Sequence, residues 1–275
     1  MKILVTGASG LVGSRFVELY PKSQDLLTPN LNEFDLANPK EYLAKNTPDV
    51  VLNFAAYTNV SEAEKQKGDK NGSCWQINVE GTRNLVSALP ANTRLIHIST
   101  DYVFSGQNGP YKETDIPETD QNKLTWYGYT KAEAEKIVGD KSTIVRLIYP
   151  VRAKYPLKLD FLRKPLDLFN QGKLYPLFID QQISMTFIDE ACIYLQKIID
   201  QNLTGIFHMS CPDTTTPYEI ITYLLQKLGK DISGIQKSSV DPKRYPKFGG
   251  LTPSFEFNPW RQIVDKLIEQ GIATS

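Results

Sequence analysis

The sequence is poor in the residues that build disulfide frameworks and metal sites, and it has no excess of either charge. Its 275 residues include three cysteines and two histidines, and 31 Lys and Arg side chains balance 31 Asp and Glu side chains. This balance argues against a protein that follows nucleic-acid phosphates, so we expect no nucleic-acid partner. Cys74, Cys192 and Cys211 are far apart without CxxC spacing, so we expect reduced thiols. Two histidines without a carboxylate cluster predict that no catalytic metal is required.

Long hydrophobic runs are also absent. The apolar stretches at residues 3–5 and 50–54 have the length of buried strands, far below the roughly 18 residues of a membrane span. Met1 and Lys2 lead directly into the first stretch, which leaves no room for a secretory signal. We therefore expect no membrane segment and a cytoplasmic location. With 41% hydrophobic and 23% charged residues, the composition is typical of a globular protein.

Strand patterns alternate with helix patterns over the first half of the chain. The strand patterns are β-branched or continuously apolar, as in buried strands. Strands are expected at residues 2–6, 49–54 and 93–99, and helices at residues 14–19, 79–89 and 131–138. Such alternation requires crossover connections and predicts a parallel sheet covered by helices on both faces. The expected fold class is α/β with a Rossmann-type, doubly wound parallel sheet.

The pattern changes near residue 150. Ten of the seventeen prolines lie from Pro150 onward, where they separate shorter helix patterns. These patterns are at residues 161–171, 187–200, 217–228 and 260–269. No internal repeat or low-complexity tract marks a linker. We expect a Rossmann domain over residues 1–148 and a smaller mixed lobe over residues 149–275, with a soft boundary at which segments can interleave.

A glycine-rich turn follows the first expected strand. Residues 6–13 read Thr-Gly-Ala-Ser-Gly-Leu-Val-Gly, a G-x-x-G-x-x-G spacing that opens a helix. Gly7 permits a tight turn, Gly10 lets the backbone approach a pyrophosphate, and Gly13 lets the helix pack against the sheet. The positive end of the helix dipole then faces the phosphates. We favour a dinucleotide site over an ordinary strand–helix turn. The expected contacts are Gly7, Ser9, Gly10, Leu11, Val12 and Gly13.

The acidic residue that usually accepts hydrogen bonds from the adenosine ribose of NAD is missing from its place. Residues 25–30 read Asp-Leu-Leu-Thr-Pro-Asn and end without Asp or Glu. This removes a charge that would repel a 2′-phosphate and slightly favours NADP(H) over NAD(H). Arg15 and Lys22 are candidates for positive charge nearby, although solvated side chains would look the same. Asp35 and Leu36 are expected at the adenine, with helix capping as the alternative for Asp35.

A tyrosine and a lysine share one face of an expected helix. Tyr127 and Lys131 are four residues apart, whereas Tyr129 is not on that face. An ammonium group favours an ionised phenol, so we expect Lys131 to lower the pKa of Tyr127 for acid–base work. On an ordinary amphipathic helix the tyrosine would pack and the lysine would be solvated. The expected strand at residues 93–99 ends at Ser99 and Thr100, where a hydroxyl can hold a substrate carbonyl or cap a turn.

Five segments, in this order, resemble the extended short-chain dehydrogenase/reductase family. They are residues 6–13, 53–56 (Asn-Phe-Ala-Ala), 77–82 (Ile-Asn-Val-Glu-Gly-Thr) and 99–104, and the pair Tyr127-x-x-x-Lys131. Within that family, further segments look like the dTDP-4-dehydrorhamnose reductase branch. These are residues 55–64, 97–105, 111–115 and 180–182.

The resemblance implies a role for each site residue. It makes Tyr127 the proton donor, Lys131 its pKa partner and ribose contact, and Thr100 the hydroxyl that binds the sugar keto oxygen. The residues that would line the nicotinamide are Ala55, Ala56 and Tyr57. Asp101 and Tyr149 would contact the substrate, although turn capping is an alternative for Asp101.

Three departures from the branch concern the substrate. Tyr149 stands where the branch usually has a tryptophan, and it can still stack on a base. Residues 152–166 are rich in Lys and Arg, which indicates either a diphosphate contact or a solvated basic surface. Lys247 stands where the reductases tend to present Arg-Pro. The substrate class is therefore better defined than the sugar or the base.

The resemblance implies NAD(P)H-dependent reduction of the C4 ketone of a nucleotide-activated 6-deoxysugar, as in dTDP-rhamnose biosynthesis, by an enzyme that can form a homodimer. One alternative is an NDP-sugar epimerase or dehydratase, although the Asp-Glu pair of dehydratases is missing beside Thr100. Another alternative is an NADP-binding regulatory subunit related to the partner of methionine adenosyltransferase.

Overall fold

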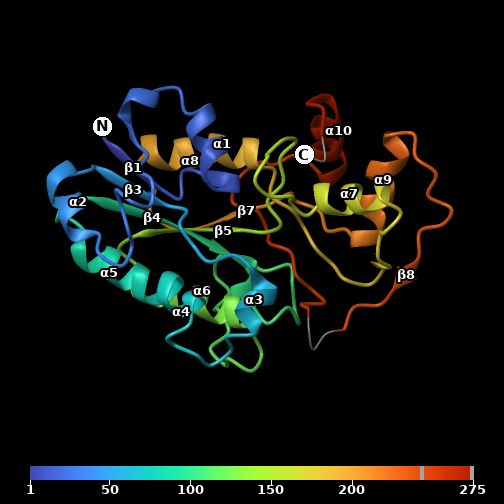
Figure 1. Cartoon of the computed structure of the whole chain (residues 1–275), viewed down its shortest axis with the longest axis horizontal. Helices are drawn as coiled ribbons and strands as arrows, with labels where there is room; N and C mark the ends of the chain where they lie inside the picture. The colour runs from blue at the N-terminus through green and yellow to red at the C-terminus, as the bar shows by residue number, and fades with distance from the viewer. Residues whose placement is uncertain (242–244, 273–275) are drawn as a thin grey trace. The chain divides into compact units, whose positions relative to one another are not determined.

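A six-stranded sheet is the central element of the computed structural model, which describes residues 1–241 and 245–272 (Figure 1). Its strands are β1 (Ile3–Thr6), β2 (Leu26–Leu27), β3 (Val50–Asn53), β4 (Arg94–Thr100), β5 (Thr143–Leu147) and β7 (Gly205–Met209). Their order is β2-β1-β3-β4-β5-β7, and β1 pairs in parallel with β2 and β3, as β3 does with β4. The expected α/β class with a doubly wound parallel sheet is confirmed.

The direction of winding reverses beside β1. β2 pairs with one side of β1 and β3 with the other. In open α/β sheets, ligands bind beyond the carboxyl ends of the strands at such a reversal. β1 and β3 end at Thr6 and Asn53, which are partners in the ladder, so the turns that follow them share one edge.

Helices cover both faces of this sheet. Figure 1 shows α1 (Leu11–Leu19) on one face and α5 (Gly81–Ala88) and α6 (Trp126–Val138) on the other. The apolar core between sheet and helices includes Leu4, Val51, Leu95, Leu85 and Val138, together with Leu43 from α2 (Lys40–Asn46). A single-turn 3₁₀-helix at Ser23–Asp25 precedes β2, and α3 (Val60–Glu64) follows β3.

The helix expected at residues 79–89 begins earlier than its sequence pattern indicated. α4 (Ser73–Trp75), a π-helical turn (Gln76–Glu80) and α5 follow one another without a break. Cys74 and Trp75 are buried, and the Trp75 ring stacks on Trp126 of α6 at 5.7 Å. These contacts with a distant segment stabilise the early turn, which local periodicity does not reveal.

Helix α6 carries both Tyr127 and Lys131. Its first turn is capped by Thr125, whose hydroxyl accepts a hydrogen bond from Gly128 N at 3.1 Å. A Cβ on Gly128 would lie 2.1 Å from the carbonyl oxygen of Tyr102, so glycine lets α6 pack closely against the 3₁₀ turn Asp101–Val103. The helix ends at Gly139, which has a positive φ of 65°.

The chain divides into two compact units. Unit 1 comprises Met1–Ser105, Ile116–Arg146 and Cys192–Phe207, and unit 2 comprises Gly106–Asp115, Leu147–Ala191 and His208–Ser275. The change between Arg146 and Leu147 lies beside the boundary drawn from the sequence at residue 148. The units also exchange two other segments. Residues 192–207 belong to unit 1, where β7 joins the main sheet, and residues 106–115 belong to unit 2.

Unit 2 has its own apolar core. It contains α7 (Arg163–Asn170), α9 (Pro217–Lys227), α10 (Trp260–Glu269) and a parallel pair of β6 (Leu177–Phe178) and β8 (Lys237–Ser238). α8 (Ile188–Asp200) begins in this unit and continues into unit 1. Buried residues of the core include Leu162, Leu166, Ile220, Leu224, Ile263 and Leu267. Within the described ranges, no helix is both long and apolar enough to cross a membrane.

A buried ion pair joins α6 to β5 in unit 1. Arg146 is fully buried and donates from Nε and Nη2 to the two carboxylate oxygens of Glu135, at 2.9 and 2.7 Å. Its guanidinium also lies 4.9 Å from the ring centroid of Phe104. Removal of one partner leaves the other charge buried and uncompensated, which costs more than the intact pair contributes.

We therefore expect Glu135→Ala to lower the free energy of unfolding by about 3–5 kcal/mol in urea denaturation. Glu133→Ala is the matched control on the same helix, because Glu133 pairs with the exposed Lys136 at 2.5 Å. An exposed pair of this kind contributes less than about 1 kcal/mol. Equal losses in the two variants would contradict the role assigned to the buried pair.

Candidate active site

Glycine allows a close backbone approach in the turn between β1 and α1. Gly7 has a φ of 64°, and a Cβ on it would lie 2.8 Å from the backbone nitrogen of Ala55. A Cβ on Gly13 would lie 2.4 Å from the carbonyl oxygen of Gly7. Gly10 is the N-cap of α1 and offers no side chain to the first N–H groups of that helix. The other expected contacts, Ser9, Leu11 and Val12, lie in this turn or at the start of α1. The turn has the form of an anion site at a helix start.

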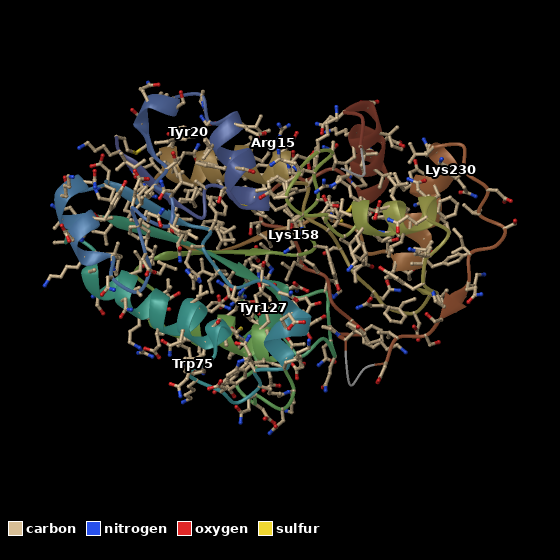
Figure 2. All side chains as sticks on the ribbon, in the orientation of Figure 1. Arg15, Tyr20, Trp75, Tyr127, Lys158 and Lys230 are labelled. Carbon is tan, nitrogen blue, oxygen red and sulfur yellow. The ribbon has the colours of Figure 1, made fainter. Side chains whose placement is uncertain are left out.

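The segment after β2 contains an acidic group that the sequence spacing did not reveal. Glu33 accepts a hydrogen bond from Asn30 N at 2.9 Å, so a carboxylate does lie beside the residues that follow β2. Asp35 accepts a hydrogen bond from Ala37 N at 2.9 Å, a local turn contact. It does not cap a helix, because α2 begins at Lys40 with Pro39 as its N-cap. Leu36 is buried in the core of unit 1. Arg15, which Figure 2 shows on α1, forms an ion pair with Glu18 at 3.0 Å.

A row of buried polar side chains crosses the carboxyl end of the sheet. Thr6 Oγ1 lies 2.5 Å from Asn53 Oδ1, Asn53 Nδ2 lies 3.1 Å from His97 Nδ1, and His97 Nε2 lies 3.0 Å from Lys131 Nζ. The first three residues are successive ladder partners on β1, β3 and β4. We call Thr6, Asn53, His97 and Lys131 the polar row. The sequence analysis did not assign Asn53 or His97 to the site. The available signal was a polar residue next to apolar ones in each strand, Asn53 after Val-Val-Leu and His97 between two isoleucines.

Lys131 lies at the end of the polar row and is 2% exposed. Its Nζ also donates to the carbonyl oxygen of Ile98 at 2.8 Å. Burial lowers the pKa of Lys131 to about 8, against opposing contributions from Glu135 and Cys74. Burial and the neighbouring Lys131 charge hold the pKa of His97 well below its usual range, so the imidazole is neutral at pH 7.

Tyr127, Thr100 and Asp101 lie together where β4 ends and α6 begins. Figure 2 shows Tyr127 at this place. Thr100 Oγ1 donates to Asp101 Oδ1 at 3.1 Å, and both side chains are buried. Burial raises the pKa of Tyr127 well above its usual value, although a hydrogen bond with Thr100 opposes this shift. We expected Lys131 to lower that pKa. In the structure burial dominates, and Lys131 Nζ contacts His97 Nε2 and the carbonyl oxygen of Ile98.

The segment after β3 is fixed to α6 by one asparagine. Asn78 Oδ1 accepts from Tyr57 N at 2.8 Å, and its Nδ2 donates to Tyr57 O at 3.2 Å and to Thr130 Oγ1 at 2.9 Å. Ala55 N donates to Thr6 Oγ1 at 3.2 Å. The expected segment of Ala55, Ala56 and Tyr57 is therefore held directly beside the glycine turn in unit 1.

In unit 2, Tyr149 has a positive φ of 38°, and its ring packs on Phe161 at a centroid distance of 4.5 Å. Positive φ is uncommon outside glycine and costs energy. The ring contact with Phe161 restricts the orientation of this side chain.

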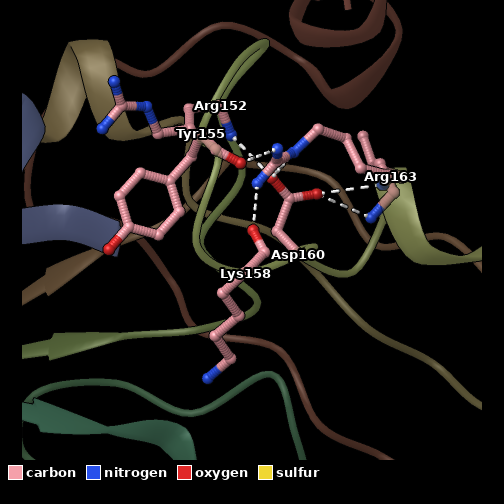
Figure 3. A network of polar contacts seen from close by, with 6 residues as sticks. Arg152, Tyr155, Lys158, Asp160 and Arg163 are labelled. Atoms are coloured by element: carbon pink, nitrogen blue, oxygen red, sulfur yellow. Dashed lines mark hydrogen bonds and ion pairs between the residues drawn. The ribbon is translucent and has the colours of Figure 1, made fainter. Parts of the chain in front are cut away.

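The basic stretch at residues 152–166 is used partly by the fold (Figure 3). Arg163 is buried, forms an ion pair with Asp160 at 2.8 Å, and donates to the carbonyl oxygens of Tyr155 and Lys158 at 2.7 and 2.6 Å. Of the two alternatives stated above for this stretch, neither describes Arg163, because its guanidinium organises the loop. Burial lowers the pKa of Lys158. Figure 3 shows the Lys158 side chain pointing away from this network.

No group of three His, Cys, Asp or Glu side chains that could hold a metal ion occurs within residues 1–241 and 245–272.

A doubly wound sheet with a glycine-rich first turn, and with Tyr and Lys four residues apart on a helix beside β4, is the arrangement of extended short-chain dehydrogenases/reductases. A family model described as "RmlD substrate binding domain" matches residues 1–253, and the chain belongs to this family.

Relatives of two kinds match the chain. The dTDP-4-dehydrorhamnose reductase of Aggregatibacter actinomycetemcomitans is 35% identical over 214 residues, which cover 74% of this chain and 69% of the relative. Methionine adenosyltransferase 2 subunit beta of Xenopus tropicalis is 26% identical over 98% of this chain and 83% of the relative. A crystal structure of dTDP-4-dehydrorhamnose reductase from Bacillus anthracis in complex with NADP shares the fold, with a TM-score of 0.85, 23% identity and coverage of 98% and 99% of the two chains.

Gly13→Ala tests the glycine turn. The added Cβ would meet the Gly7 carbonyl oxygen at 2.4 Å, so the turn must open and we expect at least tenfold weaker dinucleotide binding. Gly234→Ala is the matched control, because a Cβ there has no atom within 4 Å. Fluorescence titration with NADPH measures both variants. Unchanged affinity in Gly13→Ala would contradict the assignment of this turn.

Asp101 predicts a pH dependence of stability. Burial raises its pKa from 3.8 to about 7, so the folded protein keeps a proton that the unfolded chain loses between these values. The contribution of Asp101 to the free energy of unfolding therefore falls as the pH rises from about 4 to 7, and it is smallest above pH 7. Asp101→Asn should therefore gain stability over the wild type, by a few kcal/mol, as the pH rises through this window.

Urea denaturation at a series of pH values measures the effect. Asp140→Asn is the control, because Asp140 is exposed. A difference between wild type and Asp101→Asn that does not vary with pH would refute the burial effect.

Proposed function

We propose that the protein reduces the C4 ketone of a nucleotide-activated 6-deoxysugar with NADPH. The observation that carries this proposal is the placement of Tyr127 and Lys131 one turn apart on α6, with Thr100 at the end of β4 hydrogen-bonded to Tyr127. This arrangement occurs in a chain that is 35% identical to a dTDP-4-dehydrorhamnose reductase. The ketone class is supported better than the sugar or the base.

The glycine turn fits a dinucleotide, since a Cβ at Gly7 or Gly13 would fill the space that the backbone needs. Gly7, Gly10 and Gly13 would hold the pyrophosphate. The segment of Ala55, Ala56 and Tyr57 would line the nicotinamide. NADPH supplies a hydride when bound. The Glu33 carboxylate lies beside Asn30, where a negative charge would oppose a 2′-phosphate, so the assay compares NADPH with NADH.

Tyr127 acts as the proton donor. Its raised pKa keeps the phenol protonated at neutral pH, which suits donation to an alkoxide forming at C4. Thr100 binds the keto oxygen and orients it toward the phenol, and the buried Asp101 lies beside the sugar. Transfer of the proton leaves a tyrosinate.

Lys131 stabilises that tyrosinate. With a pKa of about 8, it is mainly an ammonium group at pH 7. A positive charge beside a phenolate lowers the free energy of the ionised form. Lys131 also contacts the cofactor ribose in this proposal.

Tyr149 stacks on the base of the nucleotide-sugar in this proposal. Stacking suits this side chain because its orientation is restricted by Phe161. The assignment of residues 1–148 to the cofactor and 149–275 to the substrate, the homodimer and the cytoplasmic location remain predictions from the sequence.

The second candidate is an NADP-binding regulatory subunit. The match to methionine adenosyltransferase 2 subunit beta over 98% of this chain favours it. A subunit of this kind binds NADP without consuming it.

The experiment is an assay of purified protein with NADPH or NADH and a dTDP-4-keto-6-deoxysugar. Loss of reduced-nicotinamide absorbance in step with formation of the 4-hydroxy sugar is the expected result. A sugar that changes without net cofactor oxidation would indicate an epimerase or dehydratase. Tight NADP binding without turnover of any nucleotide sugar would favour the regulatory subunit.

Tyr127→Phe should lower kcat by about 10²–10⁴-fold, because the proton donor is lost while the ring remains. NADPH affinity should change little. Tyr129→Phe is the matched control two residues along α6, and its ring stacks on Trp126 at 5.6 Å, so near-normal activity is expected. Full activity in Tyr127→Phe would show that another group donates the proton.

A further inference from the structure

The hydrogen bonds of the polar row depend on which nitrogen of His97 carries the proton. A neutral imidazole has one N–H donor and one bare nitrogen acceptor. His97 Nε2 faces Lys131 Nζ, and His97 Nδ1 faces the Asn53 amide. Whichever nitrogen of His97 carries the proton therefore decides what both neighbours must offer.

The structure shows the first of two consistent arrangements. Thr6 Oγ1 donates to Asn53 Oδ1, and Asn53 Nδ2 donates to the bare Nδ1 of His97. His97 then carries its proton on Nε2, which faces Lys131 Nζ at 3.0 Å. An N–H group can donate to Nζ only when Lys131 is a neutral amine.

The second arrangement accommodates a charged Lys131. The ammonium group donates to Nε2, so the proton of His97 must be on Nδ1 and needs an acceptor. Asn53 provides one when its amide turns by half a rotation and presents Oδ1 to His97. Thr6 Oγ1, which already accepts from Ala55 N, then also accepts from Asn53 Nδ2, and its hydroxyl proton no longer points to Asn53. Each charge state of Lys131 thus has one matching His97 tautomer.

We propose that Thr6, Asn53 and His97 form a hydrogen-bonded switch in which the His97 tautomer and the Asn53 amide orientation follow the proton count of Lys131. His97 is a positioning residue that acts through Lys131. The effect of His97 on the reaction rests on the proposed function, in which Lys131 stabilises a tyrosinate. The switch itself is a property of the protein alone.

The groups around Lys131 are consistent with a side chain that can be either an ammonium group or a neutral amine. Cys74 approaches from α4, Tyr127 and Glu135 lie on its own helix, and Arg146 on β5 holds Glu135 in a bidentate ion pair. Glu135 is the carboxylate that raises the pKa of Lys131, and its charge is already compensated by Arg146. His97 from β4 remains uncharged because burial lowers its pKa. The nitrogen that accepts from Lys131 is therefore on a neutral ring.

The experiment is NMR of protein labelled with ¹⁵N in the histidine rings, without cofactor or sugar. The chain has two histidines, so two rings are observed, and His97→Gln identifies the His97 signals. His97 should have its proton on Nδ1 below the pKa of Lys131 and on Nε2 above it, with a midpoint near pH 8. His208 is an internal reference, because its Nδ1 lies 3.2 Å from the Tyr111 carbonyl oxygen and carries the proton.

Two variants separate the switch from a merely structural histidine. Lys131→Met removes the titrating amine and should abolish the tautomer change, whereas Lys136→Met, at an exposed position on the same helix, should leave it intact. A single His97 tautomer across the pH range, or a doubly protonated His97 ring near pH 6.5, would overturn the proposal. Because no turnover is measured, failure of the proposed reduction would not affect this result.

Discussion

The parallel register of β1, β3 and β4 is the constraint on which the candidate site depends. It places Thr6, Asn53 and His97 side by side in one buried row. A slip of one residue would turn each side chain to the opposite face of its strand. The glycine turn after β1 and the alanine segment after β3 would then part as well, since Ala55 N is held by Thr6.

The parts of the fold that local pattern controls could be predicted from the sequence. β1, β3 and β4 lie at the three expected strand patterns, and α6 contains the helix expected at residues 131–138. The glycine turn was predictable for the same reason, because its spacing encodes a local backbone geometry. Features that need a distant partner were not. Trp75 begins a helix early because it packs on Trp126, a contact that periodicity does not show.

The candidate site follows the same division. Its residue types and their order were visible in the sequence, but their charge states were not, because burial and partners set these. Tyr127 has a raised pKa because its side chain is buried, whereas the sequence showed only a lysine four positions away. Arg163 was one of several basic residues in a row until the structure showed Asp160 and two carbonyl groups around it. A neutral chain contains strongly charged places, and most of these charges are compensated locally.

The exchange of segments between the two units has a consequence for how such a chain can vary. The chain crosses between the units five times, and one crossing falls within α8, between Ala191 and Cys192. A cut at residue 148 would separate β7 from the sheet to which it belongs. The two units therefore cannot be recombined as cassettes with those of a relative. New specificity in this architecture must arise by substitution and by changes in loop length within an intact chain.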